Sequence, residues 1–468
     1  MEEPRPERPR PPAARMVLIA ALCGATIGLL RVPEGKEPSA SPDLVARSAP
    51  TAATDVMYRL AVWIPEASLR AGYGDVLRPT PREESAVARY EVLALSTDFA
   101  DPVASHRLGI IYGERGYPEQ AQAMFARALA SGGVDTDVCL ALSLVYSEER
   151  ITPEDARRVA PLLARQPRWW ALKTGARLAD RIGTTPTAKY LHAEAHRELT
   201  QFALACGAVA MVCGALLVVG VGSLLFMVLK YLFTRERPTA PWPVRMPLFS
   251  WLDVLDVSAL VMFCGALGLA ARGALGLGAA QTWAGASLRV AHEALIVVPA
   301  LGLIIHRLRG GRSGLLLTLG VSFQDFGRQV GRGVIGAGLA LAGVFVALSL
   351  TMPSAFVGFA TVVKVTVPNI LDLLLVLLIA PIAEELIYRG YVLQALWQKL
   401  RPLPAAALSA LLFAGSHLVI TPVGFGAIFA VGFVSAYIFR WSRSLVACVV
   451  LHISYNAVVL ATELLARW

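Results

Sequence analysis

The sequence predicts an all-α protein, in which a polytopic bundle of membrane helices is joined to a helical domain outside the membrane. Of its 468 residues, 56% are hydrophobic and only 16% are charged, whereas soluble domains have about 45–50% and about 25%. The mean hydropathy is +0.57. Long apolar runs fill the chain from residue 202 onward, whereas residues 31–200 are polar enough to be water-soluble. This division predicts one part in the membrane and one part in water.

The net charge of +9, from 43 Lys and Arg against 34 Asp and Glu, does not indicate a nucleic-acid partner. The excess basic residues lie in short loops beside apolar runs, which is the pattern of membrane topology. Of the six cysteines, only Cys139 falls in the polar part. A disulfide within that part is therefore excluded, and no CxxC metal site is present.

The N-terminal 30 residues contain two predicted segments. Residues 1–15 are rich in Pro and Arg and lack an apolar face, so we expect disorder. The apolar run Met16–Leu30 follows these arginines. It fits an uncleaved signal anchor, the first membrane helix, better than the alternative of a cleavable signal peptide, because no convincing cleavage site follows it.

Residues 31–200 contain a spacing that resembles the tetratricopeptide (TPR) repeat. The positions that fit are Leu108, Gly109, Tyr112, Gly116, Ala121, Phe125 and Ala128. In the next 34-residue step Leu142, Tyr146 and Val159 recur in register, whereas Ser143 stands at the expected Gly and the small residue is shifted to Ala156. Small residues let two helices touch while Tyr and Phe fill the space beside them. We expect a TPR-like domain of two to four helix pairs that binds peptide partners, with another antiparallel α-domain as the alternative.

The apolar runs after residue 201 are long enough to cross a bilayer core of ~30 Å. Spans are expected near 202–229, 254–271, 288–306, 333–352, 369–398, 404–420, 423–439 and 444–462. Basic clusters occupy every second loop, at Lys230, Arg235, Arg237 and Arg245, at Arg307, Arg309, Arg312, Arg328 and Arg332, at Lys399 and Arg401, and at Arg440 and Arg443. Basic loops face the cytoplasm, so residues 31–200 are predicted on the non-cytoplasmic side of the plasma (inner) membrane.

The last four spans carry an unusual set of polar residues, which cost a few kcal/mol each within a membrane and mark function. They are Glu384, Glu385, Arg389, His417, His452 and Asn456. Glu385 and Arg389 are four residues apart with the acid first, which favours a helical ion pair. Glu384 is turned about 100° away and has no local cationic partner, which suits a general acid or base.

Glu384 and His417 reach the same depth only if one long helix carries the glutamate. A helix that ended at Arg389 would place the two side chains about 10 Å apart in depth, at 1.5 Å per residue. The sequence from Tyr391 to Trp397 is largely apolar. We therefore expect a continuous helix from about residue 369 to 398, ~45 Å long.

Three motifs on these spans resemble the signature of the CPBP family, the CAAX prenyl protease type II and Abi intramembrane endopeptidases. They are EExxxR at Glu384, Glu385 and Arg389, FxxxH at Phe413 and His417, and HxxxN at His452 and Asn456. The resemblance covers about residues 310–465, including the Leu319-Gly320 stretch, and does not extend to residues 1–200. It divides the membrane part into preceding helices, 202–332, and a catalytic bundle, 333–465.

The resemblance implies hydrolysis of peptide bonds in membrane-anchored protein substrates within the lipid bilayer. Glu384 and His417 would activate the attacking water, and His452 and Asn456 would stabilise the oxyanion. Glu385, Arg389 and Phe413 would support the site. A metal-free mechanism without a cofactor is favoured, with a zinc site of Glu384, His417 and His452 as the alternative. The zinc motif HExxH is absent, because Ala-Leu-Ile follows His292-Glu293.

Other readings of the polar and glycine residues stay open or are set aside. A catalytically silent scaffold or chaperone that recruits clients through the TPR-like domain is the alternative function. A transporter is disfavoured, because the sequence shows no repeated halves with broken helices.

We expect an interfacial ion cluster at Arg289, His292 and Glu293, and a solvated helix face at His192 and His196. The glycines of two spans, Gly214, Gly220 and Gly222 and then Gly333, Gly336 and Gly338, are expected to permit close helix packing.

Overall fold

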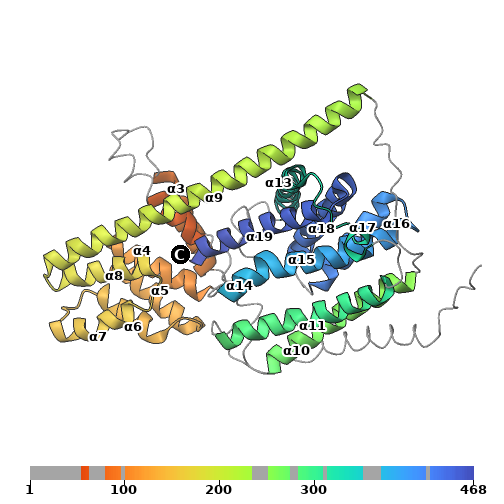
Figure 1. Ribbon diagram of the computed structural model, residues 1–468. Coiled ribbons are helices and arrows are strands. Elements are labelled where there is room, and N and C mark those ends of the chain that lie inside the picture. The colour runs from red at the N-terminus through yellow and green to blue at the C-terminus, as the bar shows by residue number, and fades with distance from the viewer. Residues whose placement is uncertain are drawn as a thin grey trace, which may run out of the picture. The chain divides into compact units, whose positions relative to one another are not determined.

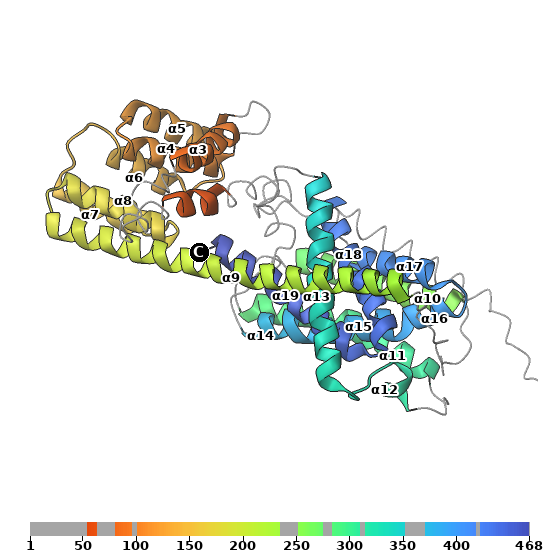
Figure 2. The same cartoon turned by 90° about the horizontal axis from the view of Figure 1, so that it is seen from above.

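The computed structural model describes residues 54–62, 80–95, 101–234, 251–274, 283–308, 314–351, 370–417 and 422–467. Regular structure in these residues is entirely helical, which confirms the predicted all-α class (Figures 1 and 2). The chain divides into two compact units, one mainly of residues 38–211 and one mainly of residues 212–353 and 365–458. Each unit is considered separately below. The predicted disordered segment and signal anchor, residues 1–30, lie outside the described residues.

The unit that contains residues 38–211 is a series of short antiparallel helices. After a helical segment at 54–62 come α3 (Thr80–Leu95), α4 (Pro102–Glu114), α5 (Pro118–Ser131), α6 (Thr136–Val145), α7 (Pro153–Leu163), α8 (Arg168–Arg181) and the start of α9 (Thr185–Thr234). Side-chain caps begin several of them. Asp101 accepts a hydrogen bond from the Val103 amide at 2.8 Å, and Thr152 and Asp155 form a reciprocal capping box.

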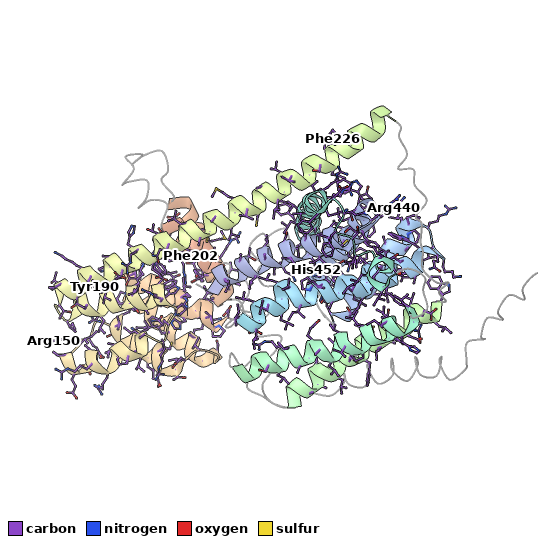
Figure 3. All side chains as sticks on the ribbon, viewed as in Figure 1. Arg150, Tyr190, Phe202, Phe226, Arg440 and His452 are labelled. Atoms are coloured by element: carbon purple, nitrogen blue, oxygen red, sulfur yellow. The ribbon has the colours of Figure 1, made fainter. Side chains whose placement is uncertain are left out.

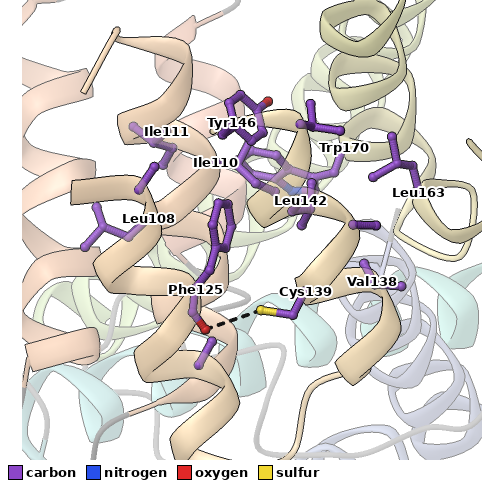
Figure 4. Close-up of a cluster of buried hydrophobic side chains, with 14 of the residues drawn as sticks. Leu108, Ile110, Ile111, Phe125, Val138, Cys139, Leu142, Tyr146, Leu163 and Trp170 are labelled. Atoms are coloured by element: carbon purple, nitrogen blue, oxygen red, sulfur yellow. Dashed lines mark hydrogen bonds between the residues drawn. The ribbon is translucent and has the colours of Figure 1, made fainter. Parts of the chain in front are cut away.

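Small residues bring these helices together, at Gly109 as the spacing predicted. A Cβ added at Gly109 would overlap the ring of Phe125. One at Gly113, a position that was not predicted, would overlap the ring of Tyr146, whereas one at the predicted Gly116 would meet no heavy atom within 4 Å. Phe125 and Tyr146 are themselves buried and stacked, with ring centroids 6.2 Å apart. Figure 4 shows this cluster, in which the Cys139 thiol contacts the Phe125 carbonyl oxygen at 3.5 Å. The helical character is confirmed, and assignment to the TPR class stays a prediction.

A partly buried carboxylate, which was not predicted, joins the first helical segment to the rest of this unit. Asp55 accepts hydrogen bonds from Tyr90 at 2.8 Å and from the Trp170 indole at 3.0 Å. It also pairs with Arg59 at 2.8 Å. Side-chain partners from positions 35 and 115 residues away cannot be read from local spacing.

The second unit is the membrane bundle. Its helices are the later part of α9, α10 (Trp251–Ala274), α11 (Trp283–Leu308), α12 (Leu315–Thr318), α13 (Phe326–Thr351), α17 (Pro402–Ser416), α18 (Pro422–Ser442) and α19 (Leu445–Arg467), together with a composite helix from 370 to 397. Within the described residues, five helices are long and apolar enough to cross a membrane, at Thr185–Phe226, Trp251–Ala271, Ser287–Leu308, Gly424–Ser442 and Leu445–Thr462. The chain is therefore a multi-pass membrane protein.

Two of these helices, α10 and α11, pack side by side (Figures 1 and 2). Arg307 near the end of α11 forms ion pairs with Asp253 and Asp256 near the start of α10. Part of the predicted basic cluster is thereby neutralised by acidic residues of the neighbouring helix. The orientation of the bundle in the membrane stays a prediction.

The expected close packing at the glycines is confirmed at four of the six. A Cβ at Gly338 would overlap the backbone of Leu216 and Gly220 across α9 and α13, and one at Gly220 would overlap the backbone of Gly338. A Cβ at Gly333 or Gly336 would overlap residues of α18 or α19. The expectation is wrong for Gly214 and Gly222, where a Cβ would meet no heavy atom within 4 Å. Those two positions face away from the α9–α13 contact.

The composite helix runs without a break from residue 370 to residue 397, as the depth argument required. It is made of α14 (Ile370–Leu374), the π-helical segment η2 (Leu375–Ile379), α15 (Ala380–Glu385), the π-helical segment η3 (Leu386–Leu393) and α16 (Gln394–Trp397). The short α-helical turn α15 therefore lies between two π-helical segments. Such segments are rare in proteins as a whole, and those that occur are often found at functional sites. They were not predicted from the sequence.

Candidate active site

Three helices bring a carboxylate and two imidazoles together inside the membrane bundle. Glu384 on α15 lies with its Oε1 3.9 Å from Nε2 of His417, which caps the C-terminus of α17. Its Oε2 lies 3.6 Å from Nε2 of His452 on α19, the helix beside α15 in Figure 3. Both distances are longer than a direct hydrogen bond. The predicted convergence of these three residues is thus present in the structure.

The orientation of His417 follows from its own helix. Its Nδ1 lies 2.8 Å from the carbonyl oxygen of Phe413, one turn earlier. Because a carbonyl oxygen only accepts hydrogen bonds, we assign the proton to Nδ1. In the neutral form of the ring, the unprotonated Nε2 then faces Glu384.

The orientation of His452 is fixed by Glu385. Nδ1 of His452 lies 3.0 Å from Oε1 of Glu385, whose side chain is fully buried. Oε2 of Glu385 accepts a hydrogen bond from Ser435 at 2.8 Å and pairs with Nε of Arg389 at 3.2 Å. The predicted Glu385–Arg389 pair is confirmed. The carboxylate–histidine contact was missed, because it joins residues 67 positions apart on different helices.

The ring of Phe413 occupies the centre of this arrangement. It makes edge-on contacts with His417 at 4.7 Å and with His452 at 5.8 Å between ring centroids. The guanidinium of Arg389 lies 4.5 Å from the same ring centroid, a cation–π distance. The aromatic residue of the FxxxH motif therefore separates the buried ion pair from the open side of the site.

Asn456 contacts the composite helix rather than Glu384. Its side-chain Nδ2 donates a hydrogen bond of 2.9 Å to the carbonyl oxygen of Val376 in η2. Asn456 lies one helical turn after His452, as predicted, but this amide hydrogen is directed at the protein backbone. The oxyanion role implied for Asn456 stays a prediction.

A metal ion at this site would need the donor atoms of Glu384, His417 and His452 around one position. Among the described residues, no group of three His, Cys, Asp or Glu side chains is arranged to hold a metal ion. The two imidazoles approach different oxygens of Glu384, at 3.9 and 3.6 Å. Ligands of one tetrahedral zinc ion lie about 3.3 Å apart, close to these separations, so the alternative zinc site stays a prediction.

Comparison with known proteins identifies this part of the chain. The model of one family, "Type II CAAX prenyl endopeptidase Rce1-like", matches residues 366–458. The chain carries an Rce1-like domain. The match supports a CAAX-type intramembrane endopeptidase as the general class of this part of the chain. Neither the curated proteins nor the solved structures contain a match to the chain.

The Rce1-like domain includes every predicted site residue and most of the surrounding helices. The carboxylates and imidazoles discussed above, with Arg389, Phe413 and Asn456, all fall within the matched range. Ser435, which donates to Glu385, also lies within it. The preceding helices, among them α10, α11 and α13, lie before the matched range.

One acidic residue from outside the Rce1-like domain approaches the site. The helix α11 packs against α14, α15 and η3, and its Glu293 interacts electrostatically with Glu384 and with Tyr388. The ion cluster expected at Arg289, His292 and Glu293 also involves Asp372, which was not predicted. Arg289 forms a buried two-pronged ion pair with Asp372, with both contacts at 2.7 Å, and His292 contacts the carbonyl oxygen of Gly265 at 3.1 Å.

The second histidine pair, His192 and His196, lies in the other unit. His192 is exposed and contacts Asp180 at 3.2 Å. The predicted solvated helix face is confirmed for this residue.

Proposed function

We propose that the chain hydrolyses peptide bonds of membrane-anchored proteins, with Glu384 and His417 activating the attacking water. The observation that carries the proposal is the meeting of one carboxylate with two imidazole Nε2 atoms from two other helices. Each imidazole has its Nδ1 occupied, by a backbone carbonyl or by Glu385. The reactive nitrogen of each ring is thereby aimed at Glu384.

A water molecule matches the groups that Glu384 and His417 present. The carboxylate and an unprotonated Nε2 both accept hydrogen bonds, so they do not bind each other directly. Water has two donor hydrogens and satisfies both acceptors at once. This arrangement orients one oxygen lone pair away from both groups, toward a substrate carbonyl.

The reaction then proceeds by general base catalysis. Glu384 takes a proton as the water oxygen bonds to the carbonyl carbon of the substrate. In its protonated form, held by the buried Glu385 carboxylate at Nδ1, His452 donates a hydrogen bond from Nε2 to the negative oxygen of the tetrahedral intermediate. Glu384 returns the proton to the departing amine nitrogen as the C–N bond breaks. The products are a free carboxylate and a free amine.

Accessibility supports this division of roles. The side chains of Glu384 and His417 are 21% and 29% exposed, whereas those of Glu385 and Arg389 are fully buried. A substrate can reach the first pair and not the second. Substrates held in the bilayer are consistent with this site, because it lies among membrane helices.

Comparative membrane proteomics tests the proposal in the cell. A strain that carries Glu384→Gln should accumulate uncut forms of one or a few membrane-anchored proteins that the wild type processes. Ser258→Ala, a change at a buried serine on α10, serves as the control and should process them normally. Identical processing in the Glu384→Gln and wild-type strains would favour the silent scaffold instead.

A further inference from the structure

Two backbone carbonyls in the π-helical segments of the composite helix accept hydrogen bonds from side chains of other helices. A carbonyl without a partner costs several kcal/mol in a membrane, and a π-helical turn shifts the usual hydrogen-bond ladder. The Val376 oxygen in η2 accepts from Asn456 of α19 at 2.9 Å. The Tyr388 oxygen in η3 accepts from Ser409 of α17 at 3.2 Å. These two carbonyls lie on either side of Glu384.

Ser409 shares a helix face with the histidine that faces Glu384. Ser409, Phe413 and His417 follow one another at four-residue intervals on α17, so their side chains lie along one face. Ser409 is buried, with 1% of its surface exposed. Its hydrogen bond therefore fixes the position of α17 along the composite helix two turns before His417.

Asn456 has the same relation to the other histidine. His452 and Asn456 are one turn apart on α19, and both contact the composite helix, through Glu385 and through the Val376 carbonyl. Each histidine helix is thus tied to a π-helical carbonyl by a side-chain donor on the face that carries its histidine.

From these contacts we infer that Ser409 is a positioning residue of the active site, and that it sets the register of α17 so that His417 meets Glu384. Asn456 sets the register of α19 in the same way. The inference rests on the proposed function for its kinetic consequences and on the hydrogen bonds for its structural ones. Ser409 does not touch substrate and acts through His417.

Purified protein in lipid nanodiscs tests the inference with three single variants and a fluorogenic peptide. Ser409→Ala removes the donor and should lower kcat about tenfold, the effect of one buried hydrogen bond, with KM unchanged. Ser409→Thr keeps the hydroxyl and should restore most of kcat. Ser258→Ala removes a buried serine hydroxyl that has no hydrogen-bond partner among the described residues, and should leave kcat unchanged.

A second measurement reports register without catalysis. In a pair of cysteine substitutions, Glu384→Cys with His417→Cys, a short thiol cross-linker should join the two positions, and adding Ser409→Ala should reduce the yield severalfold. Unchanged cross-linking would overturn the inference, as would equal kcat in Ser409→Ala and Ser258→Ala. A wild type that cleaves no peptide would count against the proposed function, while the cross-linking result would still decide the role of Ser409.

Discussion

At the scale of single residues, spacing predicted the members of the site and part of their pairing. The Glu385–Arg389 pair could be foreseen because its partners lie one turn apart on one helix. The hydrogen bond between Glu385 and His452 could not, since it depends on the rotation of two helices 67 residues apart in sequence. The electrostatic interaction of Glu293 with Glu384 was missed for the same reason. The approach of Glu293 to Glu384 depends on how α11 packs.

The contrast between neighbouring glutamates gives a stability prediction. Glu385→Gln leaves Arg389 buried without its counter-charge and should lower the free energy of unfolding by about 3–5 kcal/mol. Glu384→Gln should change it by less than about 1 kcal/mol, because Glu384 is partly exposed and its imidazole contacts are longer than hydrogen bonds. Thermal unfolding of both variants in detergent measures the difference. Equal unfolding midpoints would contradict these assignments.

The proposed mechanism also gives a prediction about metal. Because it assigns the activation of water to Glu384 and His417 without a metal ion, treatment with EDTA or phenanthroline should leave the purified enzyme active. Peptide cleavage before and after treatment, with metal content measured in parallel, provides the check. Loss of activity that zinc restores, with about one zinc per chain, would instead support the three-ligand site.

At the scale of helices, periodicity predicted where most membrane helices form but not their internal geometry. The continuous helix from 370 to 397 was foreseen from its apolar sequence and from the depth of Glu384. Its two π-helical segments were not, because Leu- and Ile-rich sequence fits α- and π-helical turns alike. Glycines are a second example. The sequence gives their positions, but only the packed structure shows which of them face a neighbouring helix.

Two glycines on neighbouring helices provide a matched pair. Gly338→Ala should destabilise the bundle, because its Cβ would overlap the backbone of α9. Gly222→Ala should be neutral or slightly stabilising, because its Cβ meets nothing within 4 Å and alanine favours helix by about 1 kcal/mol. The midpoint of thermal unfolding should therefore fall in Gly338→Ala and stay level or rise in Gly222→Ala. A Gly338→Ala midpoint as high as that of Gly222→Ala would refute the close contact of α9 with α13.

At the scale of the whole molecule, composition predicted an all-α membrane protein with a separate helical part, and both features are present. Three motifs in order located the catalytic part, and the Rce1-like match at 366–458 agrees with them. The role and the side of the helical part stay predictions. They depend on loop charge, and much of the chain that carries those charges lies outside the described residues.

The predicted orientation leads to a delivery role for residues 31–200. If they lie on the non-cytoplasmic side, deleting residues 50–195 and joining the flanking helices should spare cleavage of a short peptide and abolish cleavage of the native client. Protease protection in oriented vesicles tests the topology first. Protection of residues 31–200 together with cytoplasmic markers would contradict both the orientation and the delivery role.

The central claim is that Glu384 activates a water molecule for peptide-bond hydrolysis. Cleavage of a membrane-anchored substrate by purified protein in ¹⁸O-labelled water, followed by mass spectrometry of the new C-terminus, tests it most directly. The wild type should place one ¹⁸O atom in that carboxylate, and Glu384→Gln should lower the rate by about 100-fold to 10,000-fold while remaining folded. Cleavage at an undiminished rate by folded Glu384→Gln, or a product without ¹⁸O, would contradict the claim.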